Sequence, residues 1–231
     1  VPHLLPEDLK KLLVQFPPGT VQLEIGIQKL NPDVSLRISR AHIAESSIQN
    51  QSQDRDLKIA LKNKEILLAK KNICWIRENT GVHIHADLIV GLPGEDMESF
   101  ARGFDTLLFW NPQEIQVGIL KRLRGAPIGR HTEEWGMVYS PLPPYDVLKT
   151  SHISYEEICD LKRFARFWDL IPNSGRFIQS SSLIWQSQDS AFASFMECSG
   201  WLFEKLNSQS EIALPRLARM LEDFLVTVRG L

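Results

Sequence analysis

Gln28, Arg40 and Asp87 are the polar residues in the first half of the chain whose types and positions could do chemistry. Each lies at or just past the end of a segment with the pattern of a strand. In parallel α/β sheets ligands bind at that edge, because the strand-to-helix loops converge there. An Asp there can accept both hydroxyls of a ribose, and an Arg can bind a carboxylate through two hydrogen bonds. Spacing alone favours the structural alternative, in which Gln28 and Arg40 face solvent and Asp87 caps a helix or pairs with a cation.

Two further groups of side chains have a chemical and a structural interpretation. His83 and His85 alternate with Ile84 and therefore share one face of a strand, which would suit a metal pair. No third ligand lies nearby in the sequence, so packing or lining a strand edge is favoured and no metal site is assigned. Residues 121–124, which carry Lys121, Arg122 and Arg124, could hold an anionic substrate or form a solvated loop. No catalytic residue is assigned.

The elements that must position these residues alternate between strands and helices. Strands are predicted at residues 21–28, 83–92 and 114–120, and helices at 4–16, 32–40, 57–78 and 95–110. The run from Leu88 to Leu92 has no polar residue, which predicts a strand buried on both faces. Repeated strand–helix–strand order predicts right-handed crossovers and a parallel sheet, either open or closed into a barrel.

Local signals set the ends of these elements. Asn31 before Pro32 is a predicted helix cap, and Gly81 is a predicted C-terminal cap. Glu95, with Asp96 and Glu98, is predicted to place negative charge in the first turn of the helix after the Pro93–Gly94 turn. Residues 41–56 are polar and lack periodicity, which predicts an exposed loop.

Beyond residue 129 the pattern becomes helical. Ser154 and Glu157 form a capping box at the start of one helix, and residues 190–207 and 214–228 have amphipathic periodicity. We therefore predict two domains, an α/β domain over residues 1–129 and an α-helical C-terminal domain over residues 130–231.

Composition excludes several classes of function. The net charge of −2 does not favour a nucleic-acid surface, and no apolar run is long enough for a membrane span or a signal peptide. We therefore expect a cytoplasmic protein with no nucleic-acid or membrane partner. The three cysteines, Cys74, Cys159 and Cys198, are widely spaced, as is typical of reduced thiols. Because the chain begins at Val1, we expect a piece of a longer protein.

Three ordered motifs, covering residues 24–32, 37–40 and 85–95, resemble the second half of the radical S-adenosylmethionine barrel. In that family "G-V-Q-S-L-N", "I-N-R" and "D-L-I-x-G-L-P-G-E" follow successive strands of a partial (β/α)₆ TIM barrel. The chain is most similar to the branch that includes oxygen-independent coproporphyrinogen III oxidase and the cobalamin-binding radical enzymes. Residues 111–176 resemble an uncharacterised C-terminal extension of some cobalamin-type proteins.

The resemblance implies roles for five residues and a set of cofactors. Gln28 and Asp87 would hydrogen-bond the ribose of S-adenosylmethionine, Arg40 would contact its carboxylate, and Ile89 and Leu120 would present backbone groups to the adenine. The parent protein would be an oxidoreductase or transferase that reduces S-adenosylmethionine at a [4Fe-4S] cluster to a 5′-deoxyadenosyl radical, and cobalamin is a further expected cofactor of the parent.

The chain also departs from the family. It has no Cys-x-x-x-Cys-x-x-Cys, so the cluster ligands would lie outside it, in the N-terminal half of the same protein, and the chain alone would be inactive. The segment after Arg40 is longer than usual. A second copy paired through an exposed edge strand is a further hypothesis for a partner. Two alternatives remain: a non-catalytic scaffold that presents the helical domain to a protein, and a (β/α) hydrolase or aldolase, which lacks support because no nucleophile–base pair and no lysine within a strand is found.

Overall fold

The computed structural model describes residues 2–38 and 51–231, with side chains from residue 55 onward in the second range. The described chain divides by packing into two units, Val1–Ile153 and Ser154–Leu231. The first is a mixed α/β unit built on a parallel sheet, and the second is helical. The domain boundary predicted at residue 130 stays a prediction, and residues 130–153 pack with the first unit.

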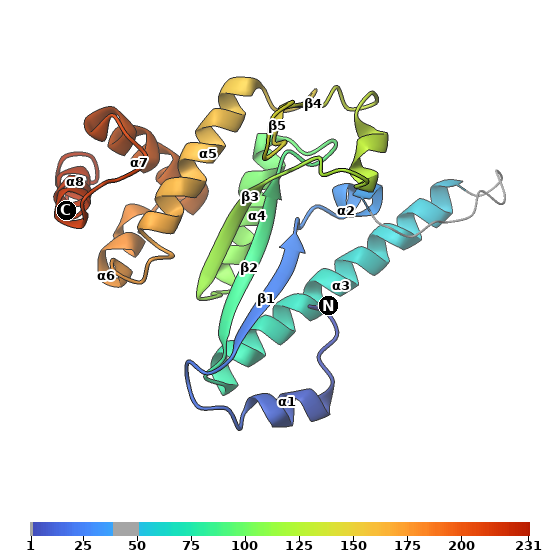
Figure 1. The fold of residues 1–231 in the computed structure, drawn as a ribbon. Helices are drawn as coiled ribbons and strands as arrows, with labels where there is room; N and C mark the ends of the chain where they lie inside the picture. The colour runs from blue at the N-terminus through green and yellow to red at the C-terminus, as the bar shows by residue number, and fades with distance from the viewer. Residues whose placement is uncertain (1, 39–50) are drawn as a thin grey trace. The chain divides into compact units, whose positions relative to one another are not determined.

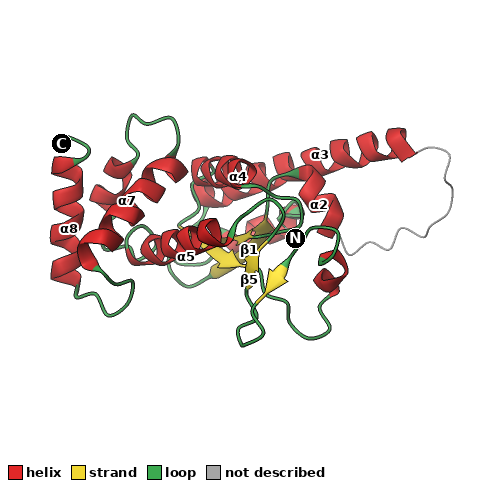
Figure 2. Cartoon of the chain, turned by 90° about the horizontal axis from the view of Figure 1, so that it is seen from above, coloured by secondary structure: helices red, strands yellow, loops and turns green. Residues whose placement is uncertain are grey.

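A three-stranded parallel sheet organises the first unit (Figure 1). Its order is β1 (Gln22–Gln28), β2 (His83–Val90) and β3 (Glu114–Ile119), which confirms the three predicted strands and their parallel pairing. Two views show α3 and α4 along one face of this sheet (Figures 1 and 2). The helices of this unit are α1 (Glu7–Leu13), α2 (Pro32–Ile38), α3 (Gln51–Asn79) and α4 (Met97–Phe109), with a 3₁₀ helix, η1 (Pro127–His131).

The sheet is buried on one face only. Side chains of β2 alternate between buried and partly exposed along the strand, so Ile84, Ala86, Leu88 and Val90 pack on one side. The prediction that this strand is buried on both faces is therefore wrong. That prediction rested on the apolar run from Leu88 to Leu92. In the structure Ile89 lies on the partly exposed face, and the strand ends at Val90. We call that face, with Gln22, Glu24, His83, His85, Asp87, Glu114 and Gln116, the polar face.

Several predicted element ends can be compared with the structure. Asn31 caps α2 as predicted, since its side chain accepts hydrogen bonds from the backbone N–H groups of Asp33 and Val34 at 3.0 and 3.3 Å. The predicted loop is wrong over residues 51–56, where α3 already begins. Gly81 does not act through a left-handed cap. A Cβ added at this position would lie 2.6 Å from Pro18 Cα, so the close approach of the two backbone segments requires glycine there.

The region after β3 contains a second, small sheet that the sequence did not predict. Strand β4 (Val138–Tyr139) pairs antiparallel with β5 (Val147–Lys149), so residues 130–153 are not helical as expected. Lys121 forms an isolated bridge with Asp146, which ties β5 to the segment that follows β3. Short strands in turn-rich sequence have too few residues to show an alternating pattern.

The second unit consists of helices around an aromatic core. Phe164, Trp168, Phe192 and Phe195 pack ring against ring, and Phe164 and Phe195 are fully buried. The capping box of Ser154 and Glu157 is present, as predicted. The predicted helices at 190–207 and 214–228 correspond to α7 and α8. The elements are α5 (Tyr155–Leu170), α6 (Ile178–Ser181), the 3₁₀ helix η2 (Ser182–Ile184), α7 (Ala191–Leu206) and α8 (Leu214–Thr227).

Candidate functional site

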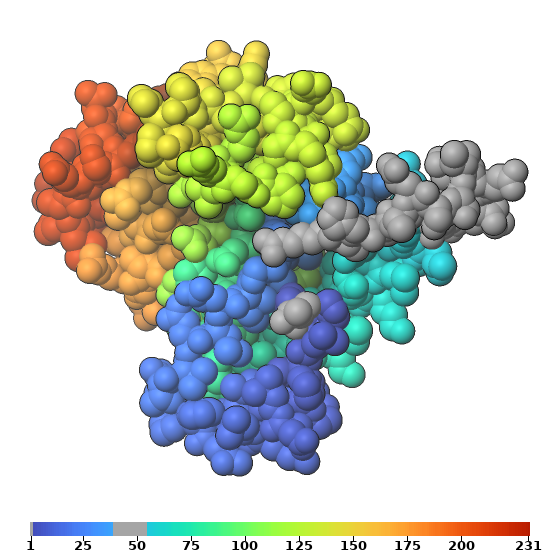
Figure 3. Space-filling view, turned by 45° about the vertical axis from the view of Figure 1, so that its right-hand side comes forward, coloured from blue at the N-terminus to red at the C-terminus, as the bar shows by residue number. Residues whose placement is uncertain are grey.

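A cavity of about 220 Å³ lies at the carboxyl ends of the three parallel strands. Its lining includes Gln28 at the end of β1, Ile89 in β2 and Leu120 after β3, which are three of the five residues with a predicted cofactor role. Residues 126–131 close its other side. In the space-filling view, the yellow-green surface of the segment after β3 lies above that of the strands (Figure 3). We call this space the rim cavity.

Gln28 reaches the rim cavity through an irregularity at the end of β1. The pairing register between β1 and β2 shifts after Gly26, so that Gln28 rather than Ile27 lies opposite Leu88. Gln28 has a φ of +60°, and the N–H of Lys29 bonds the carbonyl of Ile27 at 2.7 Å. A left-handed conformation is costly for a residue with a Cβ, by about 1–2 kcal/mol. Such strain is concentrated at functional sites.

Asp87 lies on the polar face of β2, two residues before Ile89. It is opposite Gly26 on β1 and Gln116 on β3, and its side chain is 35% exposed. Burial raises the pKa of its carboxyl group above the ordinary value, and the nearby Glu24 adds to this, while His85 acts in the opposite direction. Asp87 does not line the rim cavity, but it shares a strand face with Ile89. Its role toward a ribose stays a prediction.

Arg40, the predicted contact of the cofactor carboxylate, lies outside the described residues. Arg37, three residues earlier in the sequence, donates to the carbonyls of Pro93 and Gly94 at 3.4 and 3.3 Å, and its guanidinium stacks 4.5 Å from the centre of the Trp135 ring. Arg37 therefore holds the turn after β2 against the segment that follows η1.

The rim cavity has a basic side. Lys121, Arg130 and His131 contribute to its lining, and Arg130 donates to the carbonyl of Arg37 at 3.4 Å. Burial, and then the neighbouring charge of Arg130, lower the pKa of His131, which favours the neutral imidazole. The sequence shows these basic residues but not that they meet at the strand ends, because η1 brings Arg130 and His131 back over those ends.

A buried acid and a buried base lie behind the same strand ends. Glu95 is 2% exposed and Lys29 is 8% exposed. Burial raises the pKa of Glu95 to about 8 and lowers the pKa of Lys29 to about 8, while each group's charge partly opposes the shift of the other. The prediction that Glu95 lies in the first helical turn is wrong. Asp96 is the cap of α4, and its side chain accepts the N–H of Ser99 at 2.7 Å.

We predict that Glu95 makes the stability of the protein fall as pH rises from about 4.5 to 8. The folded state holds this proton at pH values where the unfolded chain has released it, so folding opposes ionisation throughout that interval. Glu95→Gln should flatten the decline and raise the free energy of unfolding at pH 8 by about 1–3 kcal/mol. Urea unfolding at pH 5 and pH 8 measures this. An exposed acid, Glu98→Gln, is the control, and equal slopes for the two variants would contradict the prediction.

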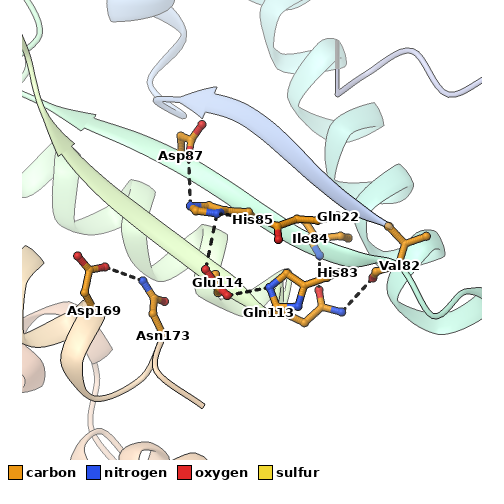
Figure 4. A network of polar contacts seen from close by, with 10 residues as sticks. All are labelled: Gln22, Val82, His83, Ile84, His85, Asp87, Gln113, Glu114, Asp169 and Asn173. Carbon is orange, nitrogen blue, oxygen red and sulfur yellow. Dashed lines mark hydrogen bonds and ion pairs between the residues drawn. The ribbon is translucent and has the colours of Figure 1, made fainter. Parts of the chain in front are cut away.

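The polar face joins residues that the sequence left apart (Figure 4). His83 and His85 share it, as predicted from their alternation. Glu114 on β3 accepts a hydrogen bond from His83 at 2.9 Å and lies 3.6 Å from His85. Sequence reasoning missed Glu114 and Glu24, since only the register between strands places them beside His85. In the described chain, no group of three or more His, Cys, Asp or Glu side chains is arranged to hold a metal ion.

A family model matches the C-terminal part of the chain. Residues 133–230 match the family described as "Protein of unknown function (DUF4080)", which covers the small antiparallel sheet and the helical unit. No match to the chain was found among curated proteins. Across the residues that the structure describes, no helix combines the length and apolar character that crossing a membrane requires.

Proposed function

We propose that this chain supplies the S-adenosylmethionine-binding strands of a radical S-adenosylmethionine enzyme, and that its parallel sheet is part of a (β/α)₆ barrel. The observation that carries the proposal is the convergence of Gln28, Ile89 and Leu120 on one cavity at the carboxyl ends of a parallel sheet. That edge is where α/β sheets and barrels bind ligands.

The rim cavity suits part of an S-adenosylmethionine molecule. Gln28 offers an amide to ribose hydroxyls, Ile89 and Leu120 offer an apolar wall to an adenine, and Lys121 and Arg130 offer positive charge to a carboxylate. Its volume of about 220 Å³ is below the roughly 300–1,000 Å³ of typical ligand sites. It would therefore hold part of the molecule, with the rest along the strand face near Asp87.

The iron–sulfur cluster would be held outside this chain. Cys74 lies in α3, Cys159 is exposed on α5 and Cys198 is buried in α7, which does not fit the closely spaced thiolates of a [4Fe-4S] site. When bound, the cluster would supply the electron that cleaves S-adenosylmethionine. This chain would bind and orient the cofactor, and alone it would be inactive. The match at residues 133–230 overlaps residues 111–176, which resemble the C-terminal extension of some cobalamin-type radical enzymes, and this overlap supports the proposal.

The outer edge of β1 is where the remaining barrel strands would pair. In the described sheet β1 pairs with β2 alone, so its other edge has backbone groups free to bond a further strand. The proposed partner is the N-terminal half of the same protein. A second copy paired at this edge is the competing arrangement, and light scattering of the isolated chain at increasing concentration distinguishes them.

The decisive experiment uses the full-length protein, reconstituted anaerobically with iron and sulfide and supplied with a reductant. We expect S-adenosylmethionine to be cleaved to methionine and 5′-deoxyadenosine, measured by chromatography. If the cluster forms and no cleavage occurs, or if the full-length protein has no cysteines at the family spacing, the chain is instead a non-catalytic scaffold.

In the same assay, Gln28→Gly is expected to raise the KM for S-adenosylmethionine by up to about tenfold, the value of one lost hydrogen bond. Because glycine adopts a φ of +60° without strain, the free energy of unfolding should stay within about 1 kcal/mol of the original or rise. Gln15→Ala, at an exposed glutamine after α1 that lines neither the rim cavity nor the polar face, is the control. An unchanged KM for Gln28→Gly would exclude Gln28 from the cofactor site.

A further inference from the structure

Three side chains form a row across the polar face, below the rim cavity. The strand register places Glu24 of β1 opposite His85 of β2, and His85 opposite Glu114 of β3. Neighbours in register project from the same side of a parallel sheet. Glu24, His85 and Glu114 are therefore neighbours in register, and Figure 4 shows His85 between Asp87 and Glu114, with Asp87 one step nearer the rim.

His85 has hydrogen-bonding capacity that its neighbours do not use. Its Nδ1 atom lies 3.4 Å from the amide nitrogen of Gln22 and 3.6 Å from Glu114, and its Nε2 atom lies 3.6 Å from Asp87. Nε2 is buried and has no hydrogen-bond partner among the described residues. His83 differs, since its Nε2 bonds Glu114 at 2.9 Å. A half-buried imidazole in long contacts can turn toward a ligand, whereas His83 already has a partner.

The charge around His85 selects against anions. The strand residues of the polar face include the carboxylates of Glu24, Asp87 and Glu114, and none of these strand residues is Lys or Arg. A phosphate or carboxylate there would meet the like charge of these carboxylates. Hydroxyl and ammonium groups would instead donate hydrogen bonds to the carboxylates.

Two strand glycines leave space beside this row. Gly26 lies opposite Asp87, and Gly118 lies opposite Ile89, both on the polar face. A Cβ at Gly26 would meet only Gln28 Cγ, at 4.0 Å, and one at Gly118 only the Leu88 carbonyl, at 3.7 Å. Neither glycine has a positive φ. Local sterics therefore do not require them, and glycines in strands often mark the close approach of a ligand.

We propose that the polar face between Gly26 and Gly118 binds an uncharged or cationic ligand rich in hydroxyl or amino groups, of the class of polyols and amino sugars, through Glu24, His85 and Glu114. Under the proposed function, on which its role as substrate rests, this ligand is the molecule presented to the cofactor in the rim cavity. Glu24 and Glu114 accept its donors, and His85 donates or accepts through Nε2.

The test is an NMR titration of the 231-residue chain with glucosamine, and with glucose 6-phosphate as the anionic counterpart. We expect glucosamine to shift the amide signals of Gly26 and Gly118 and the imidazole signals of His85, with a Kd of about 1–10 mM for so small a probe. Glucose 6-phosphate should cause no shift at these positions. Gly26→Val should abolish the shifts at Gly118 and His85 while the spectrum stays that of a folded protein, and Glu24→Gln should weaken binding at least about threefold.

The outcomes separate this site from the cofactor site. Equal binding of the two sugars, no binding of glucosamine, or binding that survives both Gly26→Val and Glu24→Gln would overturn the proposal. Should Gly26→Val fail to fold, the exposed substitution Glu24→Gln still decides. A separate titration with S-adenosylhomocysteine reads Ile89 and Leu120. If S-adenosylhomocysteine causes no shift at these residues, the result counts against the proposed function but does not contradict the polar-face site.

Discussion

Phe164→Ala is expected to lower the free energy of unfolding of the helical unit by about 3–5 kcal/mol. Phe164 is fully buried in α5, and its ring contacts Trp168, Phe192 and Phe195 at centroid distances of 5.7, 4.9 and 5.2 Å. Alanine would remove the ring on which three others pack and would leave a cavity that this rigid core cannot fill. Urea unfolding followed by tryptophan fluorescence measures the loss, since Trp168 lies in the same cluster.

Phe109→Ala is the matched control. Phe109 ends α4 in the first unit and is 78% exposed, with Lys70 Nζ 5.2 Å from its ring centre. Its removal should cost less than about 1 kcal/mol. Similar losses for the two phenylalanines would mean that the aromatic cluster does not stabilise the helical unit as its burial indicates.

The elements that sequence reasoning found were those with strong local signals. The strands at β1 and β3 alternate or are bounded by turn residues, and the caps at Asn31 and Ser154 depend on side chains within three residues of the helix start. These interactions are formed within one element, so the sequence predicts them without knowledge of the tertiary structure.

The parts that sequence reasoning missed depend on contacts between elements. Glu24 and Glu114 become neighbours of His85 only through the register of three strands, and Arg130 reaches the rim only because η1 folds back. Glu95 resembled an ordinary acid at a helix start, but packing buries it beside Lys29. The start of α3 at Gln51 was missed because its first turns are polar, and hydrophobic periodicity cannot detect such turns.

Gly94 has two structural roles, and the sequence predicts only its role in a turn. Gly94 has a φ of +70°, which the Pro93–Gly94 pair indicates, but its Cβ would also come within 2.7 and 2.8 Å of the Trp135 ring. That ring comes from a segment 41 residues later in the chain and is held there by the stacked guanidinium of Arg37. Gly94 is therefore needed both for its backbone conformation and for the approach of Trp135.

Gly94→Ala is expected to lower the free energy of unfolding of the first unit by about 2–4 kcal/mol, combining left-handed strain with overpacking against Trp135. Displacing Trp135 and Arg37 would also move Arg130 and His131 at the rim cavity, so binding of S-adenosylhomocysteine should weaken. Gly125→Ala isolates the first contribution, because Gly125 has a φ of +78° and no atom within 4 Å of the added Cβ. It should cost only about 1–2 kcal/mol. If urea unfolding gives the two alanine variants equal losses, Trp135 does not press on the turn, and the turn after β2 is held by its backbone conformation alone.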